Sequence, residues 1–365
     1  MNLSEDIRKR YCHEALSARE AQRAAQFIAW GPAVFQVSRI MVEKGILDML
    51  RDADNGLTLE EIAAKANITD YAARILLEAS LSIGTVLVDP DTDRFSLSKT
   101  GWFLITDAST KVNMDFNHYV NYLGFYDLDK ALDEGSPAGL LRLGNWPTVY
   151  EGLSQLEKRV SKSWFDFDHF YSDTSFSEAL NKVFDRPVSS LMDIGGNTGR
   201  WALQCVNHDP KVEVTIVDLP QQIGLMKDNI AGQPGAERIR GCGANLLDPN
   251  TKLPADRHYD VVWMSQFLDC FSEDQIVSIL RRVAEVADSD TRVVIMETLW
   301  DRQRFEPAAL CLTLTSVYFT AIANGNSKMY HSDRFIGLIE KAGFVVAEIA
   351  DNIGLGHSIL TCIKK

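Results

Sequence analysis

The sequence predicts an α/β protein in which a Rossmann-like parallel sheet fills the C-terminal half and a smaller helical domain precedes it. Three observations predict this class. Short apolar runs alternate with helical patterns after residue 190, the first run leads into a glycine-rich turn, and residues 58–98 read as helix, helix and hairpin. At 365 residues the chain is long enough for two domains and a substantial core.

Residues 191–218 form the segment around which this class is predicted. Residues 191–194 are a short apolar run, 201–206 have a helical pattern, and 212–217 are again apolar and β-branched. This order predicts a βαβ half-unit with a tight turn after its first strand. Asp218 closes the second strand, where a carboxylate can accept hydrogen bonds from the hydroxyls of a ribose.

The turn itself contains Gly195, Gly196 and Gly199. Glycine lets the backbone approach a nucleotide where a side chain would collide. The dinucleotide fingerprint requires glycine at the first, third and sixth positions of the turn. Here the third is Asn197 and the sixth is Arg200, so the turn does not match that fingerprint.

Composition excludes several classes of function. The net charge of -13 argues against a nucleic-acid partner, because such binding relies on lysine and arginine at phosphates. We find no apolar run near the roughly 20 residues of a membrane span, and the charged N-terminus lacks a signal core, so we expect a cytoplasmic protein without a membrane partner. Six scattered cysteines predict reduced thiols and no metal site.

The N-terminal third predicts helices followed by a hairpin. Thr58 and Glu61 have the spacing of a capping box, which starts a short helix. The expected elements are an amphipathic helix over residues 1–30 that could serve as a dimer arm, helices over 33–50 and 70–82, and a hairpin from 85–89 and 94–98.

A helix-turn-helix followed by a hairpin is a winged helix, which often binds DNA. The second helix would be the one that reads bases, and its basic side chain is Arg74, accompanied by Asp70 and Glu78. A DNA-reading helix needs a basic face. We therefore expect this domain to bind protein.

The remaining chain continues the alternation of helices and strands. Residues 101–185 read as mostly helical and are rich in aromatic side chains, which suits a pocket for a flat molecule. Beyond Asp218 we expect strands over 238–248, 259–269 and 291–300, and antiparallel edge strands over 345–351 and 357–365. The expected helices are 224–230, 272–287 (capped by Ser272), 307–324 and 332–342 (capped by Ser332).

This layout resembles the class I S-adenosylmethionine (SAM)-dependent small-molecule O-methyltransferases, which include plant caffeic-acid and bacterial polyketide-tailoring types. Asp193, Gly195, Asn197 and Gly199 are similar to the family's acid and Gly-x-Gly-x-Gly, and asparagine tolerates the positive φ of the middle glycine. The resemblance extends from about residue 30 to the end.

The resemblance implies a fold, a cofactor and an assembly. It implies a winged-helix dimerisation domain over 1–105, a helical linker and substrate-pocket segment over 106–185, and a SAM-binding domain with the class I methyltransferase sheet over 186–365. It also implies that SAM is the cofactor, that the protein is a homodimer through its N-terminal domain, and that the acceptor is an aromatic small molecule.

Family members place certain residues around SAM, and matching positions follow in this chain. Gly195, Gly196 and Gly199 would lie along the methionine and ribose of SAM. Asp218 would bind the ribose hydroxyls, Leu219 would pack on the adenine, and Asn245 would form a hydrogen bond with the adenine edge. Ser265 replaces a family lysine, and Gln266 would face the cofactor. Residues 167–173 resemble the family's Phe-x-x-x-Met-Ser-Asp segment over SAM, which implies roles for Phe167, Tyr171 and Asp173.

The catalytic positions match the family less well. A phenol, with a pKa of about 10, reacts faster once a base removes its proton. In the plant-type family a histidine after the fourth strand does this, and two acids brace it. Asp269 stands at the histidine position, Glu297 matches one acid, and Met329 replaces the other.

Three interpretations of catalysis follow. Asp269 could be the base if burial raises its pKa. A histidine from elsewhere could reach the site, and the candidates are His331, His357 and His118. Catalysis could also rest on proximity alone, or be lost.

We therefore expect a SAM-dependent methyltransferase acting on a hydroxyl of an aromatic or polyketide-like molecule. The alternatives are a SAM-binding protein of the same fold with altered or lost methyl transfer, and a winged-helix regulator that responds to a ligand. The acceptor is not encoded in any single motif, because side chains from several helices set it.

Overall fold

The computed structural model describes residues 3–365, and the chain divides into two compact units. The smaller, here called the N-terminal unit, comprises Glu14–Val120 and Lys162–Phe167. The larger, the C-terminal unit, comprises Met1–His13, Asn121–Ser161 and Asp168–Lys365. The three-part division into residues 1–105, 106–185 and 186–365 stays a prediction.

The N-terminal unit contains the predicted helices and hairpin around one apolar core. Its capping box is confirmed, since the Thr58 side chain accepts from the Glu61 N–H and the Glu61 carboxylate accepts from the Thr58 N–H. Strands β1 (Val86–Asp89) and β2 (Arg94–Leu97) pair antiparallel, as predicted. The helices are α2 (Ala18–Ala29), α3 (Gly31–Glu43), α4 (Ile46–Arg51), α5 (Leu59–Ala66), α6 (Asp70–Ile83), α7 (Lys99–Thr106) and α8 (Ala108–Phe116).

Two long helices expected in this region are each interrupted. The prediction of one helix over 1–30 was wrong, because α1 (Glu5–Tyr11) ends before Ser17, and Ser17 starts α2 with a capping box to Glu20. The helix over 33–50 breaks at Gly45, whose φ of 68° no helical residue adopts, so α3 and α4 are separate.

The C-terminal unit is built on a seven-stranded sheet in the order β5-β4-β3-β6-β7-β9-β8. Strand β9 runs antiparallel to both its neighbours, and the other pairs are parallel. The edge hairpin predicted from the sequence is therefore confirmed. The strands are β3 (Ser190–Ile194), β4 (Glu213–Asp218), β5 (Ile239–Gly243), β6 (Val261–Ser265), β7 (Arg292–Glu297), β8 (Phe344–Ile353) and β9 (His357–Lys364).

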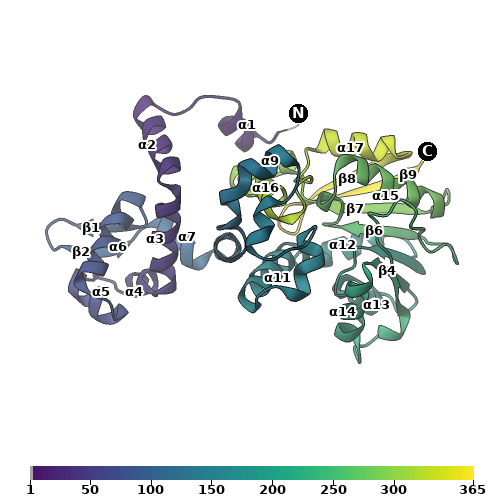
Figure 1. Cartoon of the computed structure of the whole chain (residues 1–365), viewed down its shortest axis with the longest axis horizontal. Coiled ribbons are helices and arrows are strands. Elements are labelled where there is room, and N and C mark those ends of the chain that lie inside the picture. Colours follow the sequence, from purple (N-terminus) through teal and green to yellow (C-terminus); the bar gives the residue numbers. More distant parts are fainter. Residues whose placement is uncertain (1–2) are drawn as a thin grey trace. The chain divides into compact units, whose positions relative to one another are not determined.

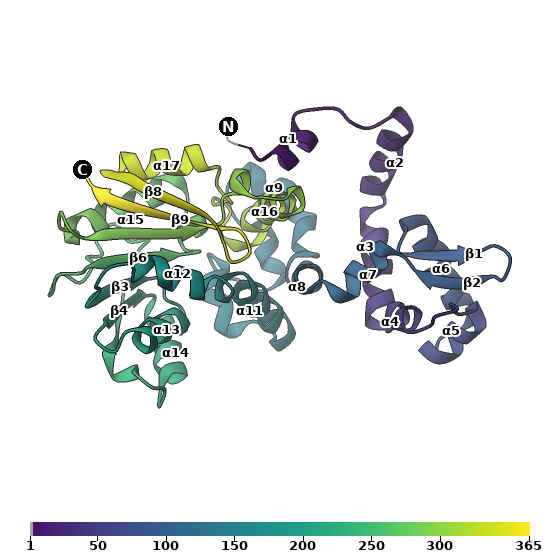
Figure 2. The ribbon, with the colours of Figure 1, turned by 180° about the vertical axis from the view of Figure 1, so that it is seen from behind.

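Helices cover both faces of this sheet, as Figures 1 and 2 show: α13 and α14 lie on one side, and α15 and α17 on the other. Alternate strand residues point to opposite faces, so Leu191 packs with α13 while Met192 packs with α15 and α17. The helices of this unit are α1, α9 (Leu128–Glu134), α10 (Val149–Gly152), α12 (Phe176–Val183), α13 (Arg200–His208), α14 (Pro220–Ile230), α15 (Glu273–Val286), α16 (Glu306–Tyr318) and α17 (Ser332–Lys341). Helix α11 (Lys158–Asp173) has residues in both units.

Two details near α16 and α17 differ from the sequence prediction. Helix α17 begins at Ser332, as the predicted range 332–342 has it, but the predicted cap was wrong, because His331 and not Ser332 is its N-cap: the His331 Nδ1 accepts the Asp333 N–H at 3.1 Å. Among the described helices, one stretch, Glu306–Ala323, is long and apolar enough to cross a membrane by length and composition, although we expected none. A single stretch of this kind is weak evidence, because core helices of water-soluble proteins pass the same test.

Candidate functional site

A cleft opens at the carboxyl ends of β3 and β6. These two strands are neighbours in the sheet. The strand that follows each of them lies toward a different edge of the sheet, since β4 pairs with β3 and β7 pairs with β6. Ligands of open α/β sheets bind at such a switch point. The turn after β3 and residues Ser265 and Gln266 at the end of β6 line the cleft together.

The glycine turn has the backbone that its sequence predicts. Gly195 and Gly199 both have a φ of 79°, and Asn197 takes a φ of 46°, which asparagine tolerates. A Cβ on Gly195 would lie 2.3 Å from the ring of Phe267. The turn thus presents bare backbone to the cleft, and a larger residue at Gly195 would displace the segment after β6.

Asp218 at the end of β4 contacts this turn from behind. Its two carboxylate oxygens accept the N–H groups of Asn197 at 2.9 Å and Leu219 at 2.7 Å. Burial raises the pKa of Asp218, and these two hydrogen bonds oppose the rise. Asn245, by contrast, is exposed, and its Oδ1 accepts the Leu247 N–H at 3.0 Å, so it forms a turn after β5.

The cleft is acidic. Asp168, Asp173 and Asp193 line it, and Arg200, the one lysine or arginine among the lining residues, pairs with Asp173. Burial, with the nearby Asp218 charge, raises the pKa of Asp193 to about 8. Burial, with the charges of Asp269 and Asp173, raises the pKa of Asp168 to about 7. This surplus of carboxyl groups suits a cationic ligand and disfavours a phosphate-bearing coenzyme.

Helix α11 turns a different face to the cleft than the sequence predicted. The lining residues on α11 are Asp168, His169, Ser172 and Asp173, which share one helical face. Of the three positions predicted here, Asp173 alone is among them.

The two other predicted residues of α11 pack against aromatic neighbours. Phe167 stacks on Phe116 at 4.0 Å between ring centroids, and Tyr171 meets Phe170 edge to face. The i, i+4 spacing of Asp168 and Ser172 was the signal that could have identified the lining face.

The segment after β6 is held by Glu297. The Glu297 Oε1 accepts the N–H groups of Phe267 at 3.1 Å and Leu268 at 2.8 Å, and its side chain is 2% exposed. Asp269 follows directly and is also buried. Burial raises the pKa of Asp269 to about 6, and burial together with the Asp269 charge raises that of Glu297 well above its usual range.

The three histidines proposed as alternative bases occupy other places. His331 uses Nδ1 to cap α17, and its Nε2 lies 3.5 Å from a carboxylate oxygen of Asp301. His357 is fully buried at the start of β9, and burial lowers its pKa to about 4. His118 belongs to the N-terminal unit, beside Phe35 and Tyr119. The histidine that lines the cleft is His169, which the sequence prediction missed.

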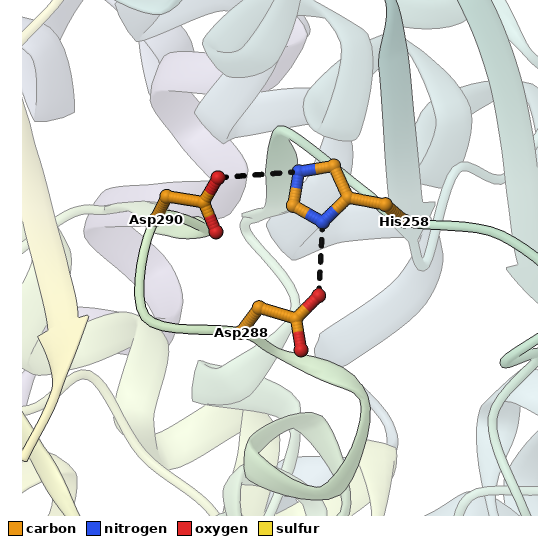
Figure 3. Close-up of side chains that lie close together, drawn as sticks. All are labelled: His258, Asp288 and Asp290. Carbon is orange, nitrogen blue, oxygen red and sulfur yellow. Dashed lines mark hydrogen bonds and ion pairs between the residues drawn. The ribbon is translucent and has the colours of Figure 1, made fainter.

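A separate group of ligating side chains lies at the amino-terminal end of β6 and β7. Figure 3 shows His258 between two carboxylates, with Nδ1 3.0 Å from Asp288 and Nε2 3.9 Å from Asp290. All three are exposed. The hydrogen bond that the His258 ring donates to the Asp288 carboxylate raises the pKa of His258, so this group behaves as a surface ion-pair cluster with both ring nitrogens engaged.

Comparison with known proteins identifies the family. The model for the O-methyltransferase domain matches residues 160–345, which is half of the chain, and that for the Dimerisation2-like domain matches 22–95. The chain belongs to the O-methyltransferase domain family. It is thus a SAM-dependent methyltransferase, and the acidic cleft with its glycine turn fits that cationic cofactor.

Relatives and solved structures agree with this placement. The methyltransferase is 25% identical over 330 residues to the L-tyrosine C(3)-methyltransferase of Streptomyces lavendulae, covering 87% of this chain and 85% of the relative. It is 22% identical to the acetylserotonin O-methyltransferase of Homo sapiens, covering 90% and 94%.

Two solved structures share the fold over more than nine-tenths of the chain. The apo SAM-dependent methyltransferase SibL has a TM-score of 0.71 at 20% identity, covering 93% of this chain and 98% of that one. The O-methyltransferase NcsB1, solved with SAM and 2-hydroxy-5-methyl naphthoic acid, has a TM-score of 0.66 at 20% identity, covering 91% and 96%. The class I methyltransferase fold is therefore confirmed.

Proposed function

We propose that this methyltransferase transfers the methyl group of SAM to the hydroxyl of a small aromatic acceptor. The observation that supports the donor site best is the cleft at the β3–β6 switch point, which combines a bare glycine turn with three carboxyl groups. SAM supplies a sulfonium methyl group that is already reactive. The turn at Gly195 would hold its methionine and ribose portions, and Asp218 with Leu219 would hold the ribose and adenine.

We assign proton removal from the acceptor to Asp269. Its pKa of about 6 lies closer to neutral pH than that of an ordinary aspartate, which makes it a better base for a phenol. Glu297 would act by positioning, since it fixes the two residues that precede Asp269. His331 caps helix α17 through its Nδ1, so we do not propose it as the base.

A ring carbon is the second candidate for the acceptor atom. The relative from Streptomyces lavendulae is named for methylation at C3 of tyrosine, and the similarity covers most of both chains. Carbon methylation beside a phenolic hydroxyl also gains from removing the phenol proton. The same Asp269 would therefore serve either reaction.

The experiment is a transfer assay with labelled SAM on a panel of phenols that includes L-tyrosine. NMR of the product distinguishes a methoxy from an aryl-methyl group. We expect Asp269→Asn to lower kcat by about 10²- to 10⁴-fold, with the affinity for S-adenosylhomocysteine (SAH) kept. A variant that keeps full kcat would leave proximity as the source of catalysis. Binding of NAD or FAD in place of SAH would refute the donor assignment.

We also propose a cytoplasmic homodimer that associates through the N-terminal unit. The match to a Dimerisation2-like domain supports this. Helix α2 buries none of its own residues in the described chain and exposes Phe27 and Ile28 at 42% and 79%, and its C-cap Trp30 is 66% exposed. Such an apolar surface favours association. Light scattering of the wild type and of Ile28→Glu would test it, and a monomeric wild type would contradict it.

A further inference from the structure

Three carboxyl groups line the cleft, and they differ in their exposure and in their partners. Asp173 pairs with Arg200 across the cleft wall. Asp193 is 2% exposed and lies beneath the turn, because a Cβ on Gly196 would come within 2.6 Å of its Oδ2. Its Oδ2 has no hydrogen-bond partner among the described residues, but at 2% exposure Asp193 offers a ligand far less surface than the partly buried Asp168 does.

Asp168 is the third, and it differs from the other two. It is only partly buried, and it faces the cleft from α11 one helical turn before Ser172. Within residues 3–365 its carboxylate makes no ion pair or hydrogen bond. A carboxylate held in a desolvated, acidic wall without a partner costs stability. The pKa of Asp168 rises to about 7 for the same reason: burial and the neighbouring carboxylates disfavour its charged form.

We propose that Asp168 binds the α-ammonium group of the methionine portion of SAM. This inference rests on the proposed donor site. The donor has two positive centres, and only the ammonium carries N–H groups that a carboxylate can accept. The turn at Gly195, which passes the methionine portion, lines the same cleft as Asp168. A charge-assisted hydrogen bond there would satisfy both groups at once.

The neighbouring carboxyl groups are poorer partners for this ammonium. Asp173 is already paired with Arg200, and Asp193 is only 2% exposed. Each carboxylate oxygen of Asp218 already accepts a hydrogen bond from a backbone N–H group, one from Asn197 and one from Leu219. Asp168 is thus the lining acid that is partly exposed and has no ion pair among the described residues, although the charge of Arg200 offsets part of the rise in its pKa.

Two probes that differ in the ammonium test the assignment by calorimetry. SAH contains the amino-acid portion, and 5′-methylthioadenosine lacks it while keeping the adenosine and the thioether. We expect Asp168→Asn to weaken SAH binding by about 10- to 100-fold and to leave methylthioadenosine binding within about threefold. Because methylthioadenosine binding reports a folded cleft, it separates a local effect from unfolding. Asp166→Asn is the matched control, since Asp166 is an exposed acid on the same helix that pairs with Lys162.

Three results would overturn the assignment. Wild-type affinity of Asp168→Asn for SAH would show that the carboxylate does not bind the donor. Equal losses for SAH and methylthioadenosine would show that Asp168 shapes the cleft and does not recognise the ammonium. If the wild-type protein bound neither probe, the proposed donor site would fail, and the role of Asp168 would fail with it.

Discussion

Replacing Glu297 should separate its structural role from its charge. The side chain is 2% exposed and its Oε1 accepts two backbone N–H groups, while Oε2 has no partner among the described residues. Glu297→Ala would leave the N–H groups of Phe267 and Leu268 buried and unpaired. At about 1–3 kcal/mol for each group, we expect a loss of about 2–6 kcal/mol in the free energy of unfolding.

Glu297→Gln should behave differently, because an amide oxygen can accept the same two hydrogen bonds. Burial and the charge of Asp269 raise the pKa of Glu297 well above its usual range in the folded protein. The unfolded state, with a pKa of about 4.3, therefore loses its proton first as the pH rises. Wild-type stability then falls, relative to Glu297→Gln, by up to about 1.4 kcal/mol per pH unit between the unfolded and folded pKa values.

Urea unfolding of the wild type and both variants, followed at pH 5, 6, 7 and 8, measures this. We expect the alanine variant to be the least stable at every pH, and the glutamine variant to gain on the wild type as pH rises. A glutamine variant as unstable as the alanine variant would mean that the ionised carboxylate is needed. A difference that stays flat with pH would show that Glu297 is ionised in the fold.

Three further changes test the rest of the site. Asp218→Ala should weaken SAH binding by about 10- to 100-fold in calorimetry, because it removes the acceptor for the ribose hydroxyls and for the Asn197 N–H. Wild-type affinity would contradict this. His331→Ala should cost about 0.5–2 kcal/mol as a lost helix cap while keeping the pH profile of kcat, and a shifted profile would restore His331 as a base. Gly195→Ala should abolish SAH binding and lower the melting temperature, since its Cβ would meet the ring of Phe267 at 2.3 Å.

Local signals in the sequence were enough to predict much of the fold. The capping box at Thr58 and Glu61 and the alternation of strands after residue 190 act over a few residues, and both are confirmed. The capping box at Ser17 and the left-handed Gly45 are equally local, and they break the two helices that we extended too far. An amphipathic pattern can continue across such a break, so periodicity alone overestimates helix length.

The site was harder to predict because it depends on contacts between distant segments. Which face of α11 meets the cleft depends on how its aromatic residues pack, and the partner of Phe167 is Phe116, about fifty residues earlier. No short window of sequence contains that pair. For the same reason the sequence favoured His331, which lies near the position of the lost bracing acid, and did not indicate His169, which lines the cleft.

Two departures from the family pattern are physically connected. In the family the histidine is braced by two acids, and it gains a positive charge that offsets theirs when it accepts the phenol proton. With Asp269 at the histidine position, a second bracing acid would place three carboxyl groups together in a dry environment, where each added charge raises the cost of the others. Met329 occupies that acid's position, is 8% exposed, and its sulfur accepts a hydrogen bond from the Thr298 hydroxyl at 3.4 Å. With Met329 there, the pair Asp269 and Glu297 stands without a third carboxyl group. Burial and the Asp269 charge raise the pKa of Glu297 well above its usual range, which favours its neutral form, and Asp269, with a pKa of about 6, is the group to which we assign proton exchange.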